Sequence, residues 1–122
     1  MSDAAAPGQA LIVYGAGGQG HVVADAAEAA GLHMLGFLDD APEAMDSEPD
    51  WPVLDHTDPR VSEAALHVAI GDAGARRRIG ERLAAQGRSL ATVVHPSAWV
   101  SPRARLGAGT YIGPQAVVHT NA

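Results

Sequence analysis

The chain has 122 residues, of which 47% are hydrophobic, so it can bury one substantial core with a small appendage but not two full domains. The net charge of −6 argues against a nucleic-acid-binding protein, because neutralising phosphates requires a basic face. The absence of cysteine excludes disulfides, thiolate metal sites and cysteine nucleophiles. No apolar run approaches the roughly 18 residues of a membrane span, and the first residues do not resemble a signal peptide, so we expect a cytoplasmic protein with no membrane partner.

The first ninety residues alternate between short apolar runs and helical segments. The apolar runs predict strands at residues 10–14, 34–38, 66–70 and 90–94, and a short strand is possible at 53–54. Helices are predicted at 21–30 and 73–86, and the proline-broken acidic segment 41–58 is predicted to be mostly loop. Strands that alternate with helices imply a parallel sheet with right-handed crossovers. We therefore predict a flexible tail over residues 1–9 and a small Rossmann-like α/β domain over 10–94.

A glycine pattern follows the first predicted strand. Gly15, Gly17 and Gly20 satisfy G-x-G-x-x-G at the start of the next helix, where glycines let the backbone turn tightly and approach a phosphate. The free N–H groups and the positive end of that helix attract the phosphate charge. Asp39 and Asp40 come about twenty residues later, at the tip of the second strand, where a carboxylate can bind a ribose or a base. A glycine-rich turn without a ligand is the alternative interpretation.

The later strand adds candidate residues to the same sheet edge. Gly71 and Asp72 follow the strand at 66–70 and would lie beside the glycine loop, while Arg76 is either a phosphate ligand or an exposed helix arginine. His21 either touches a phosphate or sugar or simply begins the helix. A dinucleotide fold needs two mononucleotide halves, and this chain holds scarcely more than one. A mononucleotide or a nucleotide-linked ligand therefore fits the chain better.

The histidines do not indicate a metal site or a catalytic site. The chain has six, but no pair has i, i+4 spacing and no carboxylate–histidine cluster is present, so no metal site is predicted. We expect His95, which precedes Pro96, to have a structural role, and His119 to point away from the chain's core. No nucleophile has a neighbouring base, so no catalytic residue is assigned.

From Val94 onward the sequence follows a period of six. Aliphatic residues recur at Val94, Val100, Leu106, Ile112 and Val118, and small residues recur four positions later at Ala98, Ala104, Thr110, Ala116 and Ala122. This period fits neither a helix nor simple strand alternation, but it fits the hexapeptide repeat of a parallel β-helix. We predict that residues 95–122 begin such a β-helix; the alternative is an irregular Pro/Gly-rich tail.

Four motifs occur in order: VYGAGGQGH at 13–21, FLDD at 37–40, VAIGD at 68–72 with Arg76, and VHPSAWVSP at 94–102. Together they resemble the bacterial sugar O/N-acetyltransferases of the sialic acid and bacillosamine (UDP-4-amino-sugar) type, which are hexapeptide-repeat transferases. The resemblance covers nearly the whole chain from Leu11 onward. It implies an N-terminal domain that holds a nucleotide-linked amino sugar, for which UDP is the expected nucleotide, and a left-handed β-helix that forms homotrimers and binds acetyl-CoA between subunits.

The resemblance also implies individual contacts, at Gly17, Gly18 and Gln19, at the two aspartates, and at Gly71 and Gly74. Combined with the analysis above, the candidate substrate-binding residues are Gly15, Gly17, Gly18, Gln19, Gly20, His21, Asp39, Asp40, Gly71, Asp72, Gly74 and Arg76. In the family the general base is a histidine followed by an acid on a later coil. His119 falls about one coil too early and precedes Thr120, so we do not assign it that role.

We therefore expect a truncated β-helix and a chain that binds a nucleotide sugar without catalysing transfer. Two other functions remain open at this point. One is a stand-alone nucleotide-binding or regulatory module that lacks transferase activity. The other is a nicotinamide-dependent oxidoreductase, which the missing second half of the fold disfavours.

Overall fold

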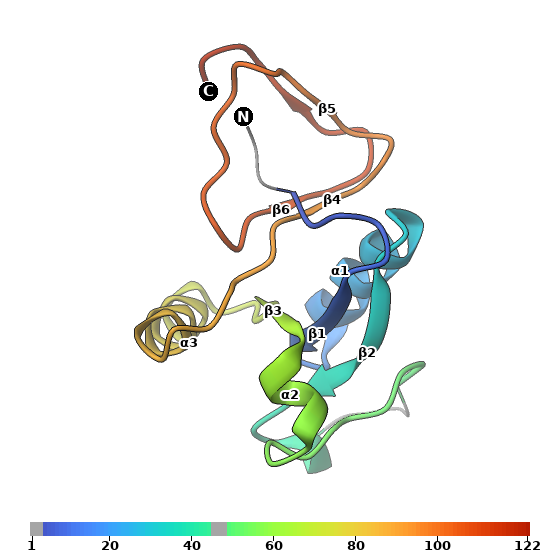
Figure 1. Cartoon of the computed structure of the whole chain (residues 1–122), viewed down its shortest axis with the longest axis vertical. Coiled ribbons are helices and arrows are strands. Elements are labelled where there is room, and N and C mark those ends of the chain that lie inside the picture. The colour runs from blue at the N-terminus through green and yellow to red at the C-terminus, as the bar shows by residue number, and fades with distance from the viewer. Residues whose placement is uncertain (1–3, 45–48) are drawn as a thin grey trace.

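Three parallel strands form the centre of the N-terminal part of the molecule in the computed structural model, which describes residues 4–44 and 49–122 (Figure 1). The strands are β1 (Ala10–Tyr14), β2 (His33–Leu38) and β3 (Ala65–Val68), in the order β2-β1-β3. Leu11, Ile12 and Val13 of β1 are at most 1% exposed, because this central strand is covered on both faces. The predicted α/β architecture with a parallel sheet is confirmed.

The helices cover both faces of this sheet. They are α1 (Gly18–Ala29), α2 (Pro59–Glu63) and α3 (Ala73–Ala85), with a 3₁₀ turn η1 (Pro42–Ala44) after β2. On one face, Val23 and Ala27 of α1 pack in a core with Val13 and Phe37. On the other face, Val61 of α2 and Leu83 of α3 pack in a second core with Ile12 and Leu66. Among the described helices, none is long and apolar enough to cross a membrane.

Two helices differ from the sequence prediction. Helix α1 begins at Gly18, three residues before the predicted start, because the low helix propensity of glycine concealed the first turn. The short helix α2 was not predicted, although Asp58 is its N-cap and accepts a hydrogen bond from the N–H of Arg60. A proline at the first helical position also suits this start.

The predicted strand 90–94 is wrong as a fourth strand of this sheet. Leu90 forms only an isolated bridge to Leu66. Beyond Ala91 the chain leaves the sheet, because Thr92 bonds elsewhere, accepting from the N–H of Ala5 and donating its hydroxyl to the carbonyl of Gly107. The predicted tail 1–9 also contacts the turn after α1, where the Gly8 N–H donates to the Gly31 carbonyl, while residues 1–3 lie outside the described residues.

The C-terminal segment winds through four two-residue strands (Figure 1). They are β4 (Val93–Val94), β5 (Trp99–Val100), β6 (Tyr111–Ile112) and β7 (Val117–Val118). β4 pairs with β6 and β5 with β7, both in parallel, so that Val94 lies opposite Ile112 and Val100 opposite Val118. The partners are three hexads apart, and the repeating aliphatic residues therefore stack on one another.

Candidate functional site

The turn after β1 needs glycine at two positions for packing. Gly15 has φ +119°, and a Cβ there would lie 2.5 Å from the carbonyl oxygen of Ala69. A Cβ at Gly20 would lie 1.8 Å from the carbonyl oxygen of Gly15. These two glycines therefore let the first turn of α1 pack against the loop and let the loop pack against the end of β3.

Gly17 and Gly18 are different, because a Cβ at either would meet no atom within 4 Å. Gly17 is the N-cap of α1 in an extended conformation (φ −82°, ψ −161°), and among the described residues no side chain caps the helix. The first N–H groups of this 12-residue helix therefore face an open, exposed surface. An uncapped N-terminus with open glycines is suited to bind an anion such as a phosphate.

Asp39 braces this loop from the end of β2. Its Oδ2 accepts a hydrogen bond from the N–H of Ala16 at 2.9 Å, and its Oδ1 accepts one from the N–H of Ala41 at 2.8 Å. A carboxylate has about four lone-pair sites, so it can also accept from a ribose hydroxyl. The predicted ligand contact of Asp39 stays a prediction.

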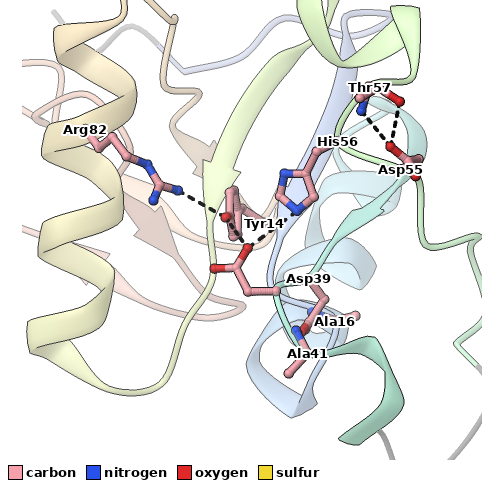
Figure 2. Close-up of polar contacts among 9 residues, drawn as sticks. Tyr14, Ala16, Asp39, Ala41, Asp55, His56, Thr57 and Arg82 are labelled. Carbon is pink, nitrogen blue, oxygen red and sulfur yellow. Dashed lines mark hydrogen bonds and ion pairs between the residues drawn. The ribbon is translucent and has the colours of Figure 1, made fainter.

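Asp40 lies in a separate polar cluster on the side of the sheet covered by α2 and α3. Its Oδ1 accepts a hydrogen bond from the hydroxyl of Tyr14 at 2.6 Å, and Nε2 of His56 lies 3.4 Å from the same oxygen. Nη2 of Arg82 donates to the Tyr14 oxygen at 3.1 Å. Figure 2 shows the Arg82 side chain of α3 pointing toward Tyr14, with His56 beside the tyrosine ring.

This cluster lines a pocket of about 550 Å³. Burial, and next the hydrogen bond to Asp40, raise the pKa of Tyr14 above its ordinary value of 10.0, so the phenol is protonated at neutral pH. Sequence reasoning selected only Asp40 of the four. The other three come from a strand, a loop and a helix, and no spacing in the sequence relates them.

The residues after β3 begin α3. Asp72 is its N-cap and accepts a hydrogen bond from the N–H of Ala75 at 2.7 Å. Nη1 of Arg76 donates to the carbonyl of Ile70 at 3.0 Å, and a Cβ at Gly74 would lie 3.3 Å from the Arg78 guanidinium. A Cβ at Gly71 would meet open space. Asp72 and Arg76 thus already have intramolecular partners, whereas Gly71 leaves the backbone accessible.

The histidine after the glycine loop is partly buried. Nδ1 of His21 lies 3.0 Å from the carbonyl oxygen of Gly17, which can only accept, so this nitrogen carries the proton. The imidazole also lies over Phe37, with ring centroids 4.8 Å apart. His21 therefore helps to hold the loop in shape. In the C-terminal segment, Nδ1 of His95 accepts a hydrogen bond from the N–H of Ser97.

A second pocket lies between the α/β domain and the C-terminal segment. It measures about 290 Å³, and Gln19 and Arg76 line it together with Thr110 and Tyr111. The site that the sequence predicted is therefore distributed over three places: the open loop with Asp39, the Asp40 cluster and this junction pocket.

Comparison with known proteins gives consistent relatives. The PglD N-terminal domain family matches residues 10–83. The UDP-N-acetylbacillosamine N-acetyltransferase of Bacillus subtilis (strain 168) is 29% identical over 108 residues, which cover 84% of this chain and 50% of that protein.

Solved structures of sugar acetyltransferases are also similar. A mutant of perosamine N-acetyltransferase from Caulobacter crescentus, in complex with CoA and GDP-perosamine, is 31% identical with a TM-score of 0.80, over 92% of this chain and 55% of that one. The acetyltransferase domain of PglB from Neisseria gonorrhoeae FA1090, in complex with acetyl coenzyme A, is 37% identical with a TM-score of 0.75, over 90% and 55%. The chain thus spans about half the length of these relatives. The resemblance to bacterial sugar acetyltransferases is confirmed, and the chain belongs to the PglD N-terminal domain family.

Proposed function

We propose that the chain is the nucleotide-sugar-binding portion of an acetyltransferase that moves acetyl from acetyl-CoA to an amine or hydroxyl of a UDP-linked sugar. The observation that carries this proposal is the uncapped N-terminus of α1 beside the open Gly17 and Gly18, in a chain of this family. Asp39, already fixed against the loop, would accept from the ribose. The substrates named for the relatives, GDP-perosamine among them, support a nucleotide-linked amino sugar as the ligand.

The domain organisation forms part of the proposal. Residues 10–94 would make a Rossmann-like nucleotide-sugar domain, and residues 95–122 the first coils of a left-handed β-helix built from hexapeptide repeats. Parallel two-residue strands whose partners are three hexads apart support the second assignment. For the full-length protein we propose a homotrimer. Trp99 and Val117, paired side by side and each more than half exposed, support an apolar contact between copies.

Acetyl transfer would be carried by regions that this chain does not span in its relatives. The acceptor amine or hydroxyl would attack the thioester carbonyl of acetyl-CoA, CoA would leave as the thiol, and a general base would take the acceptor's proton. No residue of this sequence is assigned that base. We therefore propose that the chain by itself binds the nucleotide sugar but does not transfer acetyl.

Calorimetric titration tests the binding proposal. UDP and a UDP-4-amino sugar should both bind the chain, whereas NAD should give no heat, because the fold provides one mononucleotide half. Titration with a GDP-linked amino sugar, compared with the UDP-linked one, measures the preference for the nucleotide base. Binding of NAD without binding of UDP would overturn the proposal in favour of an oxidoreductase.

A release assay for the CoA thiol tests the transferase assignment on the full-length protein. It should report thiol only when acetyl-CoA and the UDP-4-amino sugar are both present. A full-length protein that binds the nucleotide sugar without releasing thiol would instead be a regulatory module.

A further inference from the structure

His67 is a buried polar residue in the middle of β3, with 2% of its surface exposed. A buried polar group needs a hydrogen-bond partner, and its Nδ1 lies 2.8 Å from the carbonyl oxygen of Ala91. The carbonyl can only accept, so Nδ1 carries the proton. Burial lowers the pKa of His67, which favours the neutral ring at neutral pH. Nε2 therefore presents an unprotonated lone pair.

That lone pair is not sealed inside the protein. Across residues 4–44 and 49–122, every fully buried side-chain nitrogen or oxygen has a hydrogen-bond partner. In the same residues the only hydrogen bond of His67's ring is the one from Nδ1. Nε2 is therefore not completely covered, and His67 is one of the residues that line the junction pocket of about 290 Å³. The lining of the pocket thus includes one imidazole, whose Nε2 can accept a hydrogen bond.

The pocket lies next to the glycine loop, on the side away from the two aspartates. Gln19, in the uncapped first turn of α1, lines it together with Val68 of β3. Asp39 and Asp40 follow β2, which is on the opposite side of β1 in the sheet order β2-β1-β3. In a nucleotide sugar the diphosphate joins the ribose to the hexose. With the ribose at Asp39 and the diphosphate at α1, the hexose would therefore extend toward β3.

The size of the pocket also suits a hexose. Pockets for drug-sized ligands measure about 300–1,000 Å³, so about 290 Å³ suits one sugar ring better than a complete nucleotide. Thr110 and Tyr111 of the C-terminal segment also line it, so a ring bound there would lie at the boundary between the two parts of the chain.

We propose that this pocket receives the hexose of the nucleotide sugar, and that Nε2 of His67 accepts a hydrogen bond from a hydroxyl or amino group of that ring. His67 would then be a specificity-determining residue, because a ring without a donor at that position would leave the buried acceptor unpaired. The inference rests on the proposed function, since it takes a nucleotide sugar as the ligand.

Two variants distinguish the role of Nδ1 from the role of Nε2 in the His67 ring. The amide of His67→Asn can replace Nδ1 as donor to Ala91 but does not reach the position of Nε2, whereas the longer amide of His67→Gln can present an oxygen there. The affinities of UDP and of a UDP-4-amino-hexose are measured for each protein by calorimetry. We expect His67→Asn to leave the UDP affinity unchanged and to weaken the UDP-sugar about tenfold, the effect of one lost hydrogen bond. His67→Gln should recover part of that loss.

A measurement on the unaltered chain covers the case in which a variant does not fold. The ¹⁵N chemical shift of the unprotonated Nε2 moves when that atom accepts a hydrogen bond. It should shift on addition of the UDP-sugar and not on addition of UDP. If UDP binds but the UDP-sugar leaves this shift and the affinity ratio of His67→Asn unchanged, the sugar pocket is refuted while the nucleotide site stands. If neither ligand binds, the proposed function fails and this inference fails with it.

Discussion

Substituting Gly17 by aspartate should make the protein more stable and a worse nucleotide binder. Gly17 is the N-cap of α1 in an extended conformation that any residue can adopt, and a Cβ there meets no atom within 4 Å. Aspartate at an N-cap accepts a hydrogen bond from the first turn, opposes the positive end of the helix and restricts the unfolded chain. We expect the free energy of unfolding to rise by about 0.5–1 kcal/mol in total.

The same carboxylate would stand where the diphosphate is proposed to bind. Two unit charges 4 Å apart repel by about 1 kcal/mol in water and about 4 kcal/mol at the effective dielectric constant of a protein surface. Gly17 is exposed, so a value of about 2 kcal/mol is reasonable, which corresponds to about a 30-fold weaker Kd for UDP. Urea unfolding measures the first quantity and calorimetry the second.

Two further variants at Gly17 distinguish the effect of the helix cap from the effects of the charge and of the added side-chain volume. Gly17→Asn caps the helix without a charge, so it should gain stability and keep most of the UDP affinity. Gly17→Ala adds only the methyl group and no cap. Equal UDP binding by the aspartate variant and the unaltered chain would refute the assignment of the diphosphate to this helix end, whatever happens to stability.

Three other changes test the packing and the buried histidine. Gly20→Ala should lower the free energy of unfolding by about 2 kcal/mol or more, because the new methyl group would lie 1.8 Å from the Gly15 carbonyl oxygen; an unchanged urea midpoint would contradict this packing. Arg88→Ala should cost about 1–3 kcal/mol, since its Nη2 donates to carbonyls at the end of α2, and proteolysis should then cut near α2 first. The pKa of His67 is lowered from 6.5, so the unfolded chain binds its proton more readily; stability should be full above pH 6.5 and decrease as the pH falls below it. His67→Phe should reduce that pH dependence. Equal slopes of the unfolding free energy against pH in the variant and the unaltered chain would contradict this prediction.

The elements predicted well are those with a strong local pattern. Residues 10–14 are a run of apolar residues closed by glycine, and the strand has these bounds. Helix α3 ends within one residue of its prediction, because the chain beyond it turns at a glycine with positive φ, Gly87. The cluster around Tyr14 was not predictable in this way. Its members are far apart in sequence, and only the folded chain brings Arg82 of α3 to the tyrosine hydroxyl.

Asp39 and Asp40 show how much strand geometry adds to a motif. The sequence predicts both as ribose or base ligands because they are adjacent at the tip of β2. Side chains alternate between the two faces of an extended chain, and the two carboxylates accordingly separate. Asp39 turns to the glycine loop at Ala16, and Asp40 turns to Tyr14 on the other side. A single ligand at the glycine loop is therefore better served by Asp39.

The mispredicted strand also explains why the junction pocket exists. Residues 90–94 are mostly apolar, and three of them, Thr92, Val93 and Val94, are β-branched, which favours a strand, but the pattern cannot indicate which sheet the strand joins. The segment begins at the edge of β3 with Leu90 and ends against β6 with Val93, whose N–H donates to the carbonyl of Thr110. That bond fixes Thr110 and Tyr111 beside the end of β3, where they form the wall of the pocket above His67. The C-terminal segment thus contributes to the candidate site, because its residues Thr110 and Tyr111 complete the lining of the junction pocket.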